Sequence, residues 1–435
     1  MGTKMDDAWD TVFNSLDLLS AIESNGFVQI SAATIKTEGG REPRLMAKHD
    51  TINSRPKIFK KHNLSILPIK NGEYVIYRDM KKKSYFKYDS EFDDVLKEIY
   101  VPSPDFEMIE SLNGQSITSE SQAIDYANLV SLLNTFTNES QLHLTIRGRL
   151  RSGNFSIQLP DINENIEVNG VQIEVDSGYE GNNGIYLIEA KMGKRDDFHI
   201  RQLYYPWKEW SQKSRKPVIP IFFFYSNGIF YLTKFQFGDN FGDLKIIELR
   251  SFSIDEDPIL VVNYEEIIGS VPMDASEPEG VPFPQANDLD KIIDIITYYR
   301  EDLKTKKQIS EYFDFHGRQG DYYANAAIYL DLLKRESENS GSFILTDLGE
   351  EMRRCPNRRC RNRLLFTQLL KRPLFRLAIK LLKDYNFNWG EINKDEIAQT
   401  IMQNDIRYNE TTSRRRASTV KSWMKWICAN IEFTT

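Results

Sequence analysis

Cysteine and histidine are scarce in this chain of 435 residues, which contains three of the first and five of the second. Cys355 and Cys360 lie close together, but no second pair of Cys or His follows them nearby. A structural zinc site needs four such ligands at close spacing, so none is expected here. So few cysteines are typical of a protein that works in a reducing compartment.

Long apolar stretches are missing as well. No run is long enough to cross a membrane, and the first residues lack the pattern of a signal peptide. No repeat of the length found in solenoid proteins is evident. We therefore expect an intracellular protein of two to four domains, located in the cytoplasm of a prokaryote, with no membrane contact.

Positive charge is also scarce, except at one end. The chain has a formal net charge of −7, yet residues 351–435 contain 18 Lys and Arg against 8 Asp and Glu, a net of +10. The other 350 residues therefore carry −17. This asymmetry indicates that the C-terminal region binds a polyanion, because Lys and Arg gain most where they displace counterions from phosphate.

The most informative stretch is VQIEVDSGYEGNNGIYLIEAKMG, residues 171–193. Two short apolar runs flank a Gly/Asn turn, which predicts a β-hairpin. Residues two apart in a strand share a face, so Glu189 and Lys191 point the same way. If the strands pair across Gly181–Gly184, Asp176 meets Glu189 and Lys191 at one place. Two carboxylates and an ammonium can hold Mg²⁺ against a phosphate and activate a water.

The order of elements around this hairpin extends the pattern. A helical stretch, 119–136, precedes two strand-like runs and the hairpin. A helix beginning near Asp196 or Asp197 and two apolar strands joined at Ser226–Gly228 follow it. Helix, strands, helix and strand in this order, with Asp176 and Glu189-x-Lys191, resemble the PD-(D/E)xK nuclease superfamily over about residues 117–237. The residue before Asp176 is Val175 rather than Pro, so the first half departs from the motif.

The resemblance implies further site residues. Many such nucleases carry an extra acid at the start of the leading helix, which here is Glu120, and a Gln on the helix after the ExK strand, which here is Gln202. The alternative for Glu120 is a helix-start acid favoured by the helix dipole. It also implies a Mg²⁺ cofactor, with Asp176 and Glu189 as its ligands and Asp176, Glu189, Lys191, Glu120 and Gln202 as the catalytic set.

Candidate DNA contacts occur in four places outside this set. Donors suited to phosphates or base edges recur in each, and the alternative in each is a solvated surface or a surface for protein contacts. The residues are Arg41, Arg44 and Lys48 near the N-terminus; Arg147 and Arg149 on a strand before the hairpin; Arg318, Tyr322 and Asn325 at a helix start; and Arg414, Arg415 and Arg416 in the last helix, which Thr412 or Ser413 can cap.

We expect five segments. They are an N-terminal α+β domain (1–112), the nuclease core (113–255), a linker (256–286) rich in Pro and acids, a winged helix-turn-helix (287–352), and a second helical or winged-helix domain (353–435). The predicted fold class is therefore α/β (α+β), with a restriction-endonuclease-like core around a mixed central sheet and mainly-α winged-helix domains at the C-terminus.

Two classes of function fit this sequence. The first is a sequence-specific, Mg²⁺-dependent endonuclease of double-stranded DNA, most like a type II restriction enzyme and acting as a homodimer on a symmetric site. A repair or junction nuclease is another member of this class. The second is a DNA-binding regulator or a defence-complex subunit whose nuclease-like domain is structural. The complete set of Asp176, Glu189 and Lys191 favours the enzyme.

Overall fold

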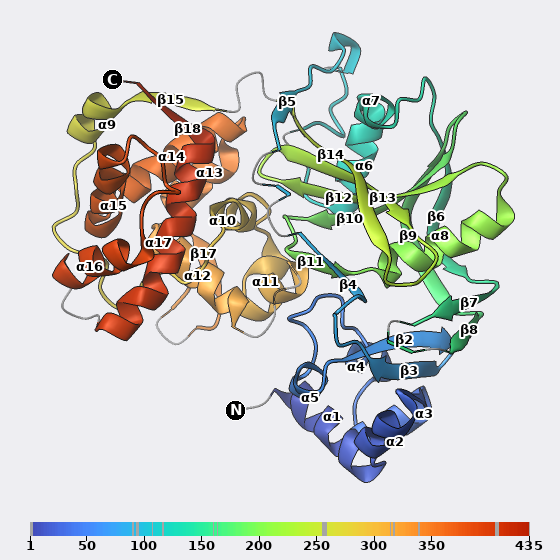
Figure 1. The fold of residues 1–435 in the computed structure, drawn as a ribbon. Helices are drawn as coiled ribbons and strands as arrows, with labels where there is room; N and C mark the ends of the chain where they lie inside the picture. Colours follow the sequence, from blue (N-terminus) through green and yellow to red (C-terminus); the bar gives the residue numbers. More distant parts are fainter. Residues whose placement is uncertain are drawn as a thin grey trace. The chain divides into compact units, whose positions relative to one another are not determined.

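The structure is a computed structural model of the chain and shows a mixed α/β protein with several sheets and many helices (Figure 1). It describes residues 3–88, 91–92, 95–106, 108–114, 117–159, 161–162, 164–254, 259–313, 315, 318–337, 340–404 and 409–434. The chain divides into two compact units. Unit 1 comprises Met1–Leu96, Ser119–Tyr225 and Phe230–Ser251, and unit 2 comprises Lys97–Thr118, Ser226–Ile229 and Phe252–Thr435.

The first part of unit 1 packs small helices on a sheet. Its elements are α1 (Lys4–Ser15), α2 (Leu18–Asn25), β1 (Phe27–Ser31), α3 (Ala32–Gly39), α4 (Pro43–Met46), α5 (Lys57–Lys61), β2 (Leu64–Lys70) and β3 (Glu73–Arg78). Asn71 and Gly72 between two apolar runs predict a hairpin, and β2 and β3 form it. The apolar spacing over residues 7–26 predicts one helix that ends at Gly26, but the structure has two, because Asp17 takes a left-handed conformation between them (φ 47°). Trp9, Phe13 and Phe59 form the core below the sheet.

Two strands from much later in the chain complete this sheet. Its order is β1-β3-β2-β8-β7, where β7 is Asn154–Gln158 and β8 is Asn165–Asn169. The sequence correctly predicts β7 as a strand but places it among the strands of the nuclease core, which is wrong. The buried residues of β7 and β8, Phe155, Ile157, Ile166 and Val168, alternate with exposed ones, as expected for strands buried on one face.

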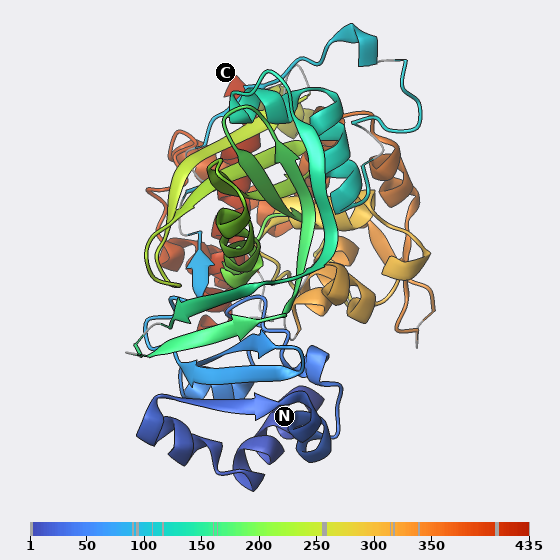
Figure 2. The same ribbon diagram turned by 90° about the vertical axis from the view of Figure 1, so that its right-hand side faces the viewer.

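The central sheet of unit 1 contains the predicted hairpin (Figure 2). Its strands in unit 1 run in the order β14-β13-β12-β10-β9-β6, and they are mixed, because β10 pairs parallel with β12 and antiparallel with β9. The strands are β6 (His143–Arg151), β9 (Gln172–Glu180), β10 (Ile185–Met192), β12 (Val218–Ser226), β13 (Ile229–Phe237) and β14 (Leu244–Ser253). A separate pair joins β4 (Tyr85–Lys87) to β11 (Asp197–His199).

Helices α6 (Glu120–Leu129), α7 (Leu132–Thr137) and α8 (Arg201–Lys213) complete this part of unit 1, and both α6 and α8 pack against β9 and β10. The sequence offers Ser119 or Thr118 as the cap of α6, and the structure uses Ser119, whose hydroxyl accepts the N–H of Gln122. The expected continuous helix over 119–136 is broken by Ser131, which has φ 63°. The helix expected to begin at Asp196 or Asp197 begins at Arg201 instead, because that segment first forms β11.

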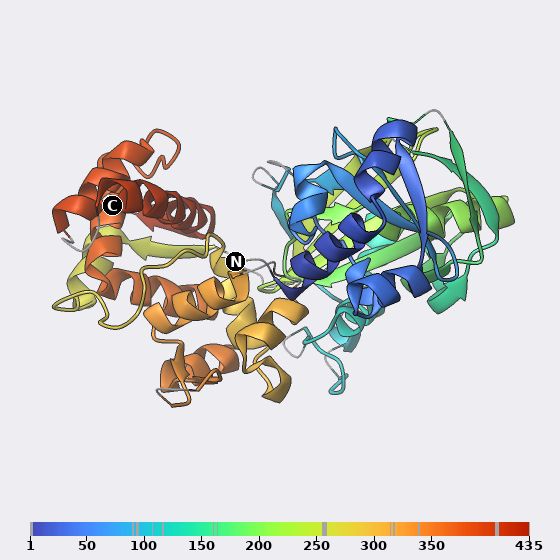
Figure 3. The same cartoon turned by 90° about the horizontal axis from the view of Figure 1, so that it is seen from below.

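Unit 2 is mainly helical (Figures 1 and 3). Helices α10, α11 and α12 are followed by the antiparallel pair β16–β17, as the sequence predicts. Gly320 is required where α12 meets α11, because a Cβ there would lie 2.5 Å from the carbonyl oxygen of Lys306. The elements are β5 (Lys97–Ile99), η1 (Pro104–Phe106), β15 (Leu260–Asn263), α9 (Tyr264–Ser270), α10 (Leu289–Thr297), η2 (Glu301–Leu303), α11 (Lys306–Tyr312), α12 (Gln319–Tyr329), β16 (Leu333–Arg335), β17 (Phe343–Leu345), α13 (Asp347–Arg354), α14 (Arg358–Lys371), α15 (Pro373–Asp384), α16 (Lys394–Asn404), α17 (Glu410–Asn430) and β18 (Ile431–Thr434).

The scarcity of cysteine and of long apolar stretches can be compared with the structure. Cys355 and Cys360 form a disulfide with a Cα–Cα distance of 5.6 Å, a pairing that the scarcity of cysteine does not predict. Across the described residues, none of the helices is long and apolar enough to cross a membrane.

A buried polar network in unit 2 centres on the turn that the sequence places at Ser226–Gly228. Asn227 is 2 % exposed; its N–H donates to Asp294 Oδ1 (2.8 Å) and its side-chain amide donates to Asp290 (2.9 Å). The Ser226 hydroxyl donates to Asp294 Oδ2 at 2.6 Å. Burial raises the pKa of Asp294 to about 7, although the hydrogen bonds from the Ser226 hydroxyl and the Asn227 N–H lower it.

The raised pKa makes the stability of unit 2 depend on pH. The folded state holds the Asp294 proton more tightly than the unfolded state, in which the pKa is close to 3.8. We therefore expect this residue's stabilising contribution to be complete below about pH 4 and to fall as the pH rises to about 7, by about 1.4 kcal/mol for each unit of pKa difference. Chemical unfolding at several pH values should show this fall in the wild type and a flatter profile in Asp294→Asn; equal slopes would contradict it.

Candidate active site

The predicted hairpin is present, and a carboxylate holds its turn. Glu139, at the end of α7, accepts the N–H groups of Asn182 and Asn183 (3.0 and 2.8 Å) and the hydroxyl of Tyr186 (2.9 Å). Burial alone would raise the pKa of Glu139, but these hydrogen bonds hold it below its ordinary value. The turn therefore fixes the register in which Ile185 pairs with Glu180 and Ile188 with Ser177.

Asp176 lies where the two strands separate. The β9–β10 register ends at Ser177 and Ile188, so the next residues of β10 have no ladder partner on β9. Asp176 Oδ2 fills this gap by accepting the N–H of Ala190 at 2.8 Å. The Asp176 side chain is thereby fixed beside the segment Glu189–Lys191. Its other oxygen, Oδ1, accepts no hydrogen bond from the described residues.

Glu189 is the hub of the cluster. Its Oε1 accepts hydrogen bonds from Lys191 Nζ (2.6 Å) and Gln202 Nε2 (2.8 Å). The Glu189 and Lys191 side chains are only 12 % and 15 % exposed. Lys191 and Gln202 thus both contact Glu189 directly. Asp176 contacts the backbone N–H of Ala190, the residue between Glu189 and Lys191. The positions of α8 and β10 put Gln202 here, as the resemblance implies.

Glu120, the remaining residue of the predicted catalytic set, influences the pKa of Glu189. The pKa of Glu189 is raised to about 8, mainly by burial; Lys191 lowers it, and the negative charges of Asp176 and Glu120 contribute to the rise. Glu120, the first residue of α6, therefore lies within electrostatic range of Glu189. Glu189 therefore lies in the field of two other carboxylates, and the Lys191 ammonium contacts it directly.

The chemistry of these donors fits a hard divalent cation. Mg²⁺ takes oxygen ligands, and proteins commonly supply one or two carboxylates while substrate phosphate and water supply the rest. Asp176 Oδ1 and Glu189 Oε2 are carboxylate oxygens without hydrogen-bond donors among the described residues, and a cation would offset the mutual repulsion that raises the pKa of Glu189. Within the described ranges, no group of three or more His, Cys, Asp or Glu is arranged as a complete metal-binding site.

Arg147 and Arg149 are already paired. Arg147 makes an ion pair with Asp125 of α6 and donates to Ser177 Oγ through Nη2 (2.7 Å) and Nε (3.1 Å). Arg149 Nε lies 3.5 Å from Glu174 Oε1, with both side chains more than half exposed. Arg147 therefore braces β9 next to Asp176, whereas Arg149 lies on the surface in a weak ion pair.

The N-terminal candidates approach the start of α8. Exposed Lys48 lies 3.5 Å from Asp50, whose other oxygen is 3.6 Å from Arg201 Nη2. Exposed Arg44 acts with Arg201 on the pKa of Tyr74, which burial raises and both cations lower. Arg41 is half-buried just before α4. Arg201 precedes Gln202 and links this basic cluster to the site, although no local pattern in the sequence indicates it.

The candidates in the middle of unit 2 sit at one helix start. Arg318 is exposed at the N-cap of α12, and Tyr322 and Asn325 are half-buried on its first two turns. Asn325 Oδ1 accepts Arg335 Nη2 from β16 at 3.5 Å. All three therefore lie on or beside the third helix of the α10–α12 group.

The three consecutive arginines of α17 do not share one environment. The helix begins at Glu410 with Asn409 as its N-cap, so the predicted caps Thr412 and Ser413 are wrong and the arginines lie in the second turn. Arg414 and Arg415 are exposed, but Arg416 is 7 % exposed. Arg414 Nη2 lies 3.2 Å from Glu410 and its Nε 3.4 Å from Asp395. Arg414 and Arg415 are thus open to an external anion, and Arg416 is not.

Three family models match the chain. Each is described as a domain of unknown function: DUF6996 over residues 6–76, DUF6997 over 80–253 and DUF7226 over 291–432. The second match contains the whole Asp176–Gln202 cluster, and the third spans both C-terminal segments predicted from the sequence. No curated protein and no solved structure matches.

Proposed function

We propose that the chain is a sequence-specific, Mg²⁺-dependent endonuclease of double-stranded DNA, of the type II restriction enzyme kind, in the cytosol of a prokaryote. The observation that supports it most is the contact set around Glu189: Lys191 at 2.6 Å, Gln202 at 2.8 Å and Asp176 on the intervening N–H of Ala190. This set occupies the point where β9 and β10 diverge, as in the PD-(D/E)xK proteins that the sequence resembles. The proposed fold of unit 1 is accordingly restriction-endonuclease-like.

Hydrolysis of a phosphodiester joins a water oxygen to phosphorus and breaks one P–O ester bond. In the proposed reaction Asp176 and Glu189 would hold the Mg²⁺, which would neutralise charge on the phosphate and supply a water of lowered pKa. Lys191 stabilises negative charge on the phosphate and positions the attacking water. Gln202 fixes the Glu189 carboxylate through its 2.8 Å hydrogen bond, and Glu120 adds negative charge to the cation site.

We assign the recognition of DNA to basic and polar side chains outside the active site. In unit 2, the order of α10, α11, α12 and the β16–β17 pair supports a winged-helix module with α12 as its DNA-contacting helix. Arg318, Tyr322 and Asn325 on α12, and Arg414 and Arg415 on α17, are its proposed DNA contacts. In unit 1, Arg41, Arg44 and Lys48 are assigned the same role beside the site.

A second candidate is a DNA-binding regulator or defence-complex subunit with a structural nuclease-like domain. The same experiment separates the two candidates, because a structural domain binds DNA without cutting it.

The test is a digest of supercoiled plasmid by the full-length protein. We expect Mg²⁺ to support conversion to linear DNA and EDTA to abolish it. Because one active site cuts one strand, we also expect sedimentation of a homodimer on DNA. Intact plasmid with a folded protein would reject the enzyme, and a monomer on DNA that leaves only nicked circles would reject the dimer.

A further inference from the structure

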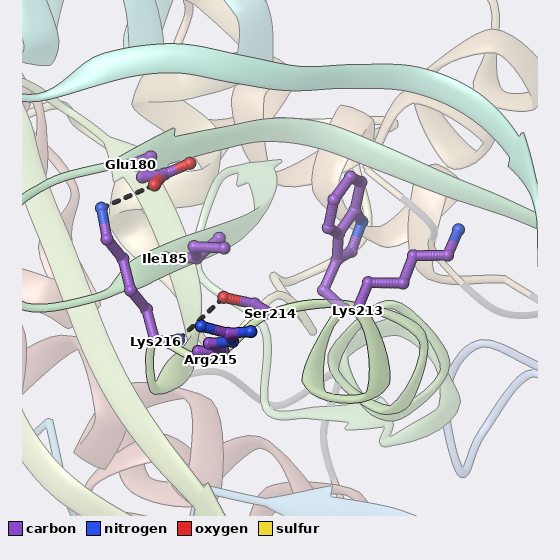
Figure 4. A pocket seen from close by; sticks show the side chains of 7 residues that line it. Glu180, Ile185, Lys213, Ser214, Arg215 and Lys216 are labelled. Atoms are coloured by element: carbon purple, nitrogen blue, oxygen red, sulfur yellow. Dashed lines mark hydrogen bonds and ion pairs between the residues drawn. The ribbon is translucent and has the colours of Figure 1, made fainter.

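A pocket opens where α8 ends, away from the Glu189 cluster (Figure 4). It has a volume of about 350 Å³, within the range of small-ligand sites. Ile185 and Glu180 line it from the turn end of the hairpin, and Trp210, Lys213, Arg215 and Lys216 line it from α8 and the loop that follows. All of these residues belong to unit 1.

The pocket is basic. Three cations and one carboxylate, Glu180, line it, a formal excess of +2. Lys216 Nζ is held by Glu180 (2.6 Å) and the Gly181 carbonyl (2.8 Å), and Lys213 is paired with Glu209. Arg215 is exposed and has no ion pair within the described part of the chain. Arg215 is therefore the cation that is available to a ligand.

Trp210 lines the pocket with its indole ring, and its Nε1 is buried and donates to no described residue. A buried atom is out of reach of a ligand, so the ring forms an apolar wall of the pocket. Ser214 shapes the loop beside it, because its Oγ accepts the N–H of Lys216 at 2.9 Å. A ligand with acceptor oxygens and negative charge would complement Arg215.

The position of the pocket relative to the cluster indicates the source of that ligand. Ile185 and Glu189 are four residues apart on β10, which places them about 13 Å apart along the strand. Phosphates of one DNA strand advance by about 3.4 Å along the duplex axis, so this distance corresponds to about four nucleotides. For a DNA strand that runs along β10, a phosphate held at Glu189 would place another phosphate within reach of the pocket.

We propose that this pocket binds a phosphate group of the DNA strand, a few nucleotides from the phosphate held at Glu189. This inference rests on the proposed function for its choice of DNA over a free phosphate ester. Arg215 supplies the charge, while Lys213 and Lys216 keep the surroundings positive. The pocket is a binding subsite and takes no part in bond breaking.

The test measures DNA binding without cleavage. Full-length protein carrying Asp176→Ala is titrated against a short labelled duplex at several salt concentrations, alone and with Arg215→Ala added. We expect Arg215→Ala to lower the salt slope by about one and the affinity about fivefold at 0.15 M salt.

The control is Lys245→Ala, which removes an exposed cation on β14, outside the pocket; it should bind like the parent. Titrations with inorganic phosphate and with a nucleoside monophosphate form the second arm. Phosphate or nucleotide binding that Arg215→Ala abolishes, with duplex binding unchanged, would overturn the assignment to DNA. No change in any titration would overturn the pocket as a phosphate site. If the wild type binds DNA through Arg215 but does not cut it, the proposed nuclease activity is rejected and the phosphate-binding pocket is retained.

Discussion

Replacing Glu189 by Gln is expected to reduce DNA cleavage by about 10²–10³-fold or more, because charged groups at the reacting phosphate supply much of the rate in such reactions. The Glu189 side chain contacts both Lys191 and Gln202, and its charge is the nearest complement to a cation held with Asp176. The substitution keeps the shape of the side chain and removes only the charge. Asp176→Ala and Lys191→Ala should lose activity to a similar degree.

The matched control for this prediction is Glu174→Gln on the same hairpin. Glu174 is 53 % exposed and pairs with Arg149 at 3.5 Å, outside the cluster. Exposed ion pairs contribute little, so this variant should cut DNA at the wild-type rate. All variants should bind DNA in Ca²⁺ as the wild type does. Wild-type cleavage by Glu189→Gln, Asp176→Ala or Lys191→Ala would show that the chemistry lies elsewhere.

The double variant Arg414→Ala/Arg415→Ala is expected to weaken DNA binding by about 30-fold at 0.15 M salt and to lower the salt slope by about two. Each exposed arginine that contacts a phosphate releases about one counterion, and the losses of affinity from removing two such contacts multiply. Arg414 is 61 % exposed, and its pairs with Glu410 and Asp395 are surface pairs that DNA can replace. Arg416 is left unchanged because it is buried.

The control for the arginine pair is Lys36→Ala/Lys380→Ala, which removes two exposed cations from α3 and α15. It tests whether net charge alone explains the loss. Fluorescence anisotropy against salt concentration gives both affinity and slope. Equal affinity and slope for the arginine variant and the wild type would mean that this face of α17 binds something other than DNA.

Local signals in the sequence were strong enough to predict the hairpin that carries the site. The Gly/Asn turn and the alternation of apolar residues fix β9 and β10, and the period of two then puts Glu189 and Lys191 on one face. Ser119 as the cap of α6 and the turn at Gly72 follow from similarly local chemistry. Gln202 was placed by resemblance, and its contact with Glu189 depends on how α8 packs against β10.

Features that depend on distant contacts were not predictable in this way. Asp17 and Ser131 break helices whose apolar pattern is continuous, because each takes a positive φ that helical periodicity does not reveal. Residues 197–199 form a strand with β4 from over 100 residues earlier, which delays the start of α8. The burial of Arg416 and the pocket around Arg215 likewise arise from packing between separate segments.

The most direct test of the central proposal is to sequence the ends of all fragments produced from plasmid and phage DNA with Mg²⁺. A sequence-specific nuclease that cuts through Asp176, Glu189 and Lys191 should give discrete fragments whose ends share one short motif at a fixed offset. Parallel digests with EDTA or with Glu189→Gln should leave the DNA intact. Ends scattered without a motif would contradict sequence specificity, and the same fragments from Glu189→Gln would contradict the site.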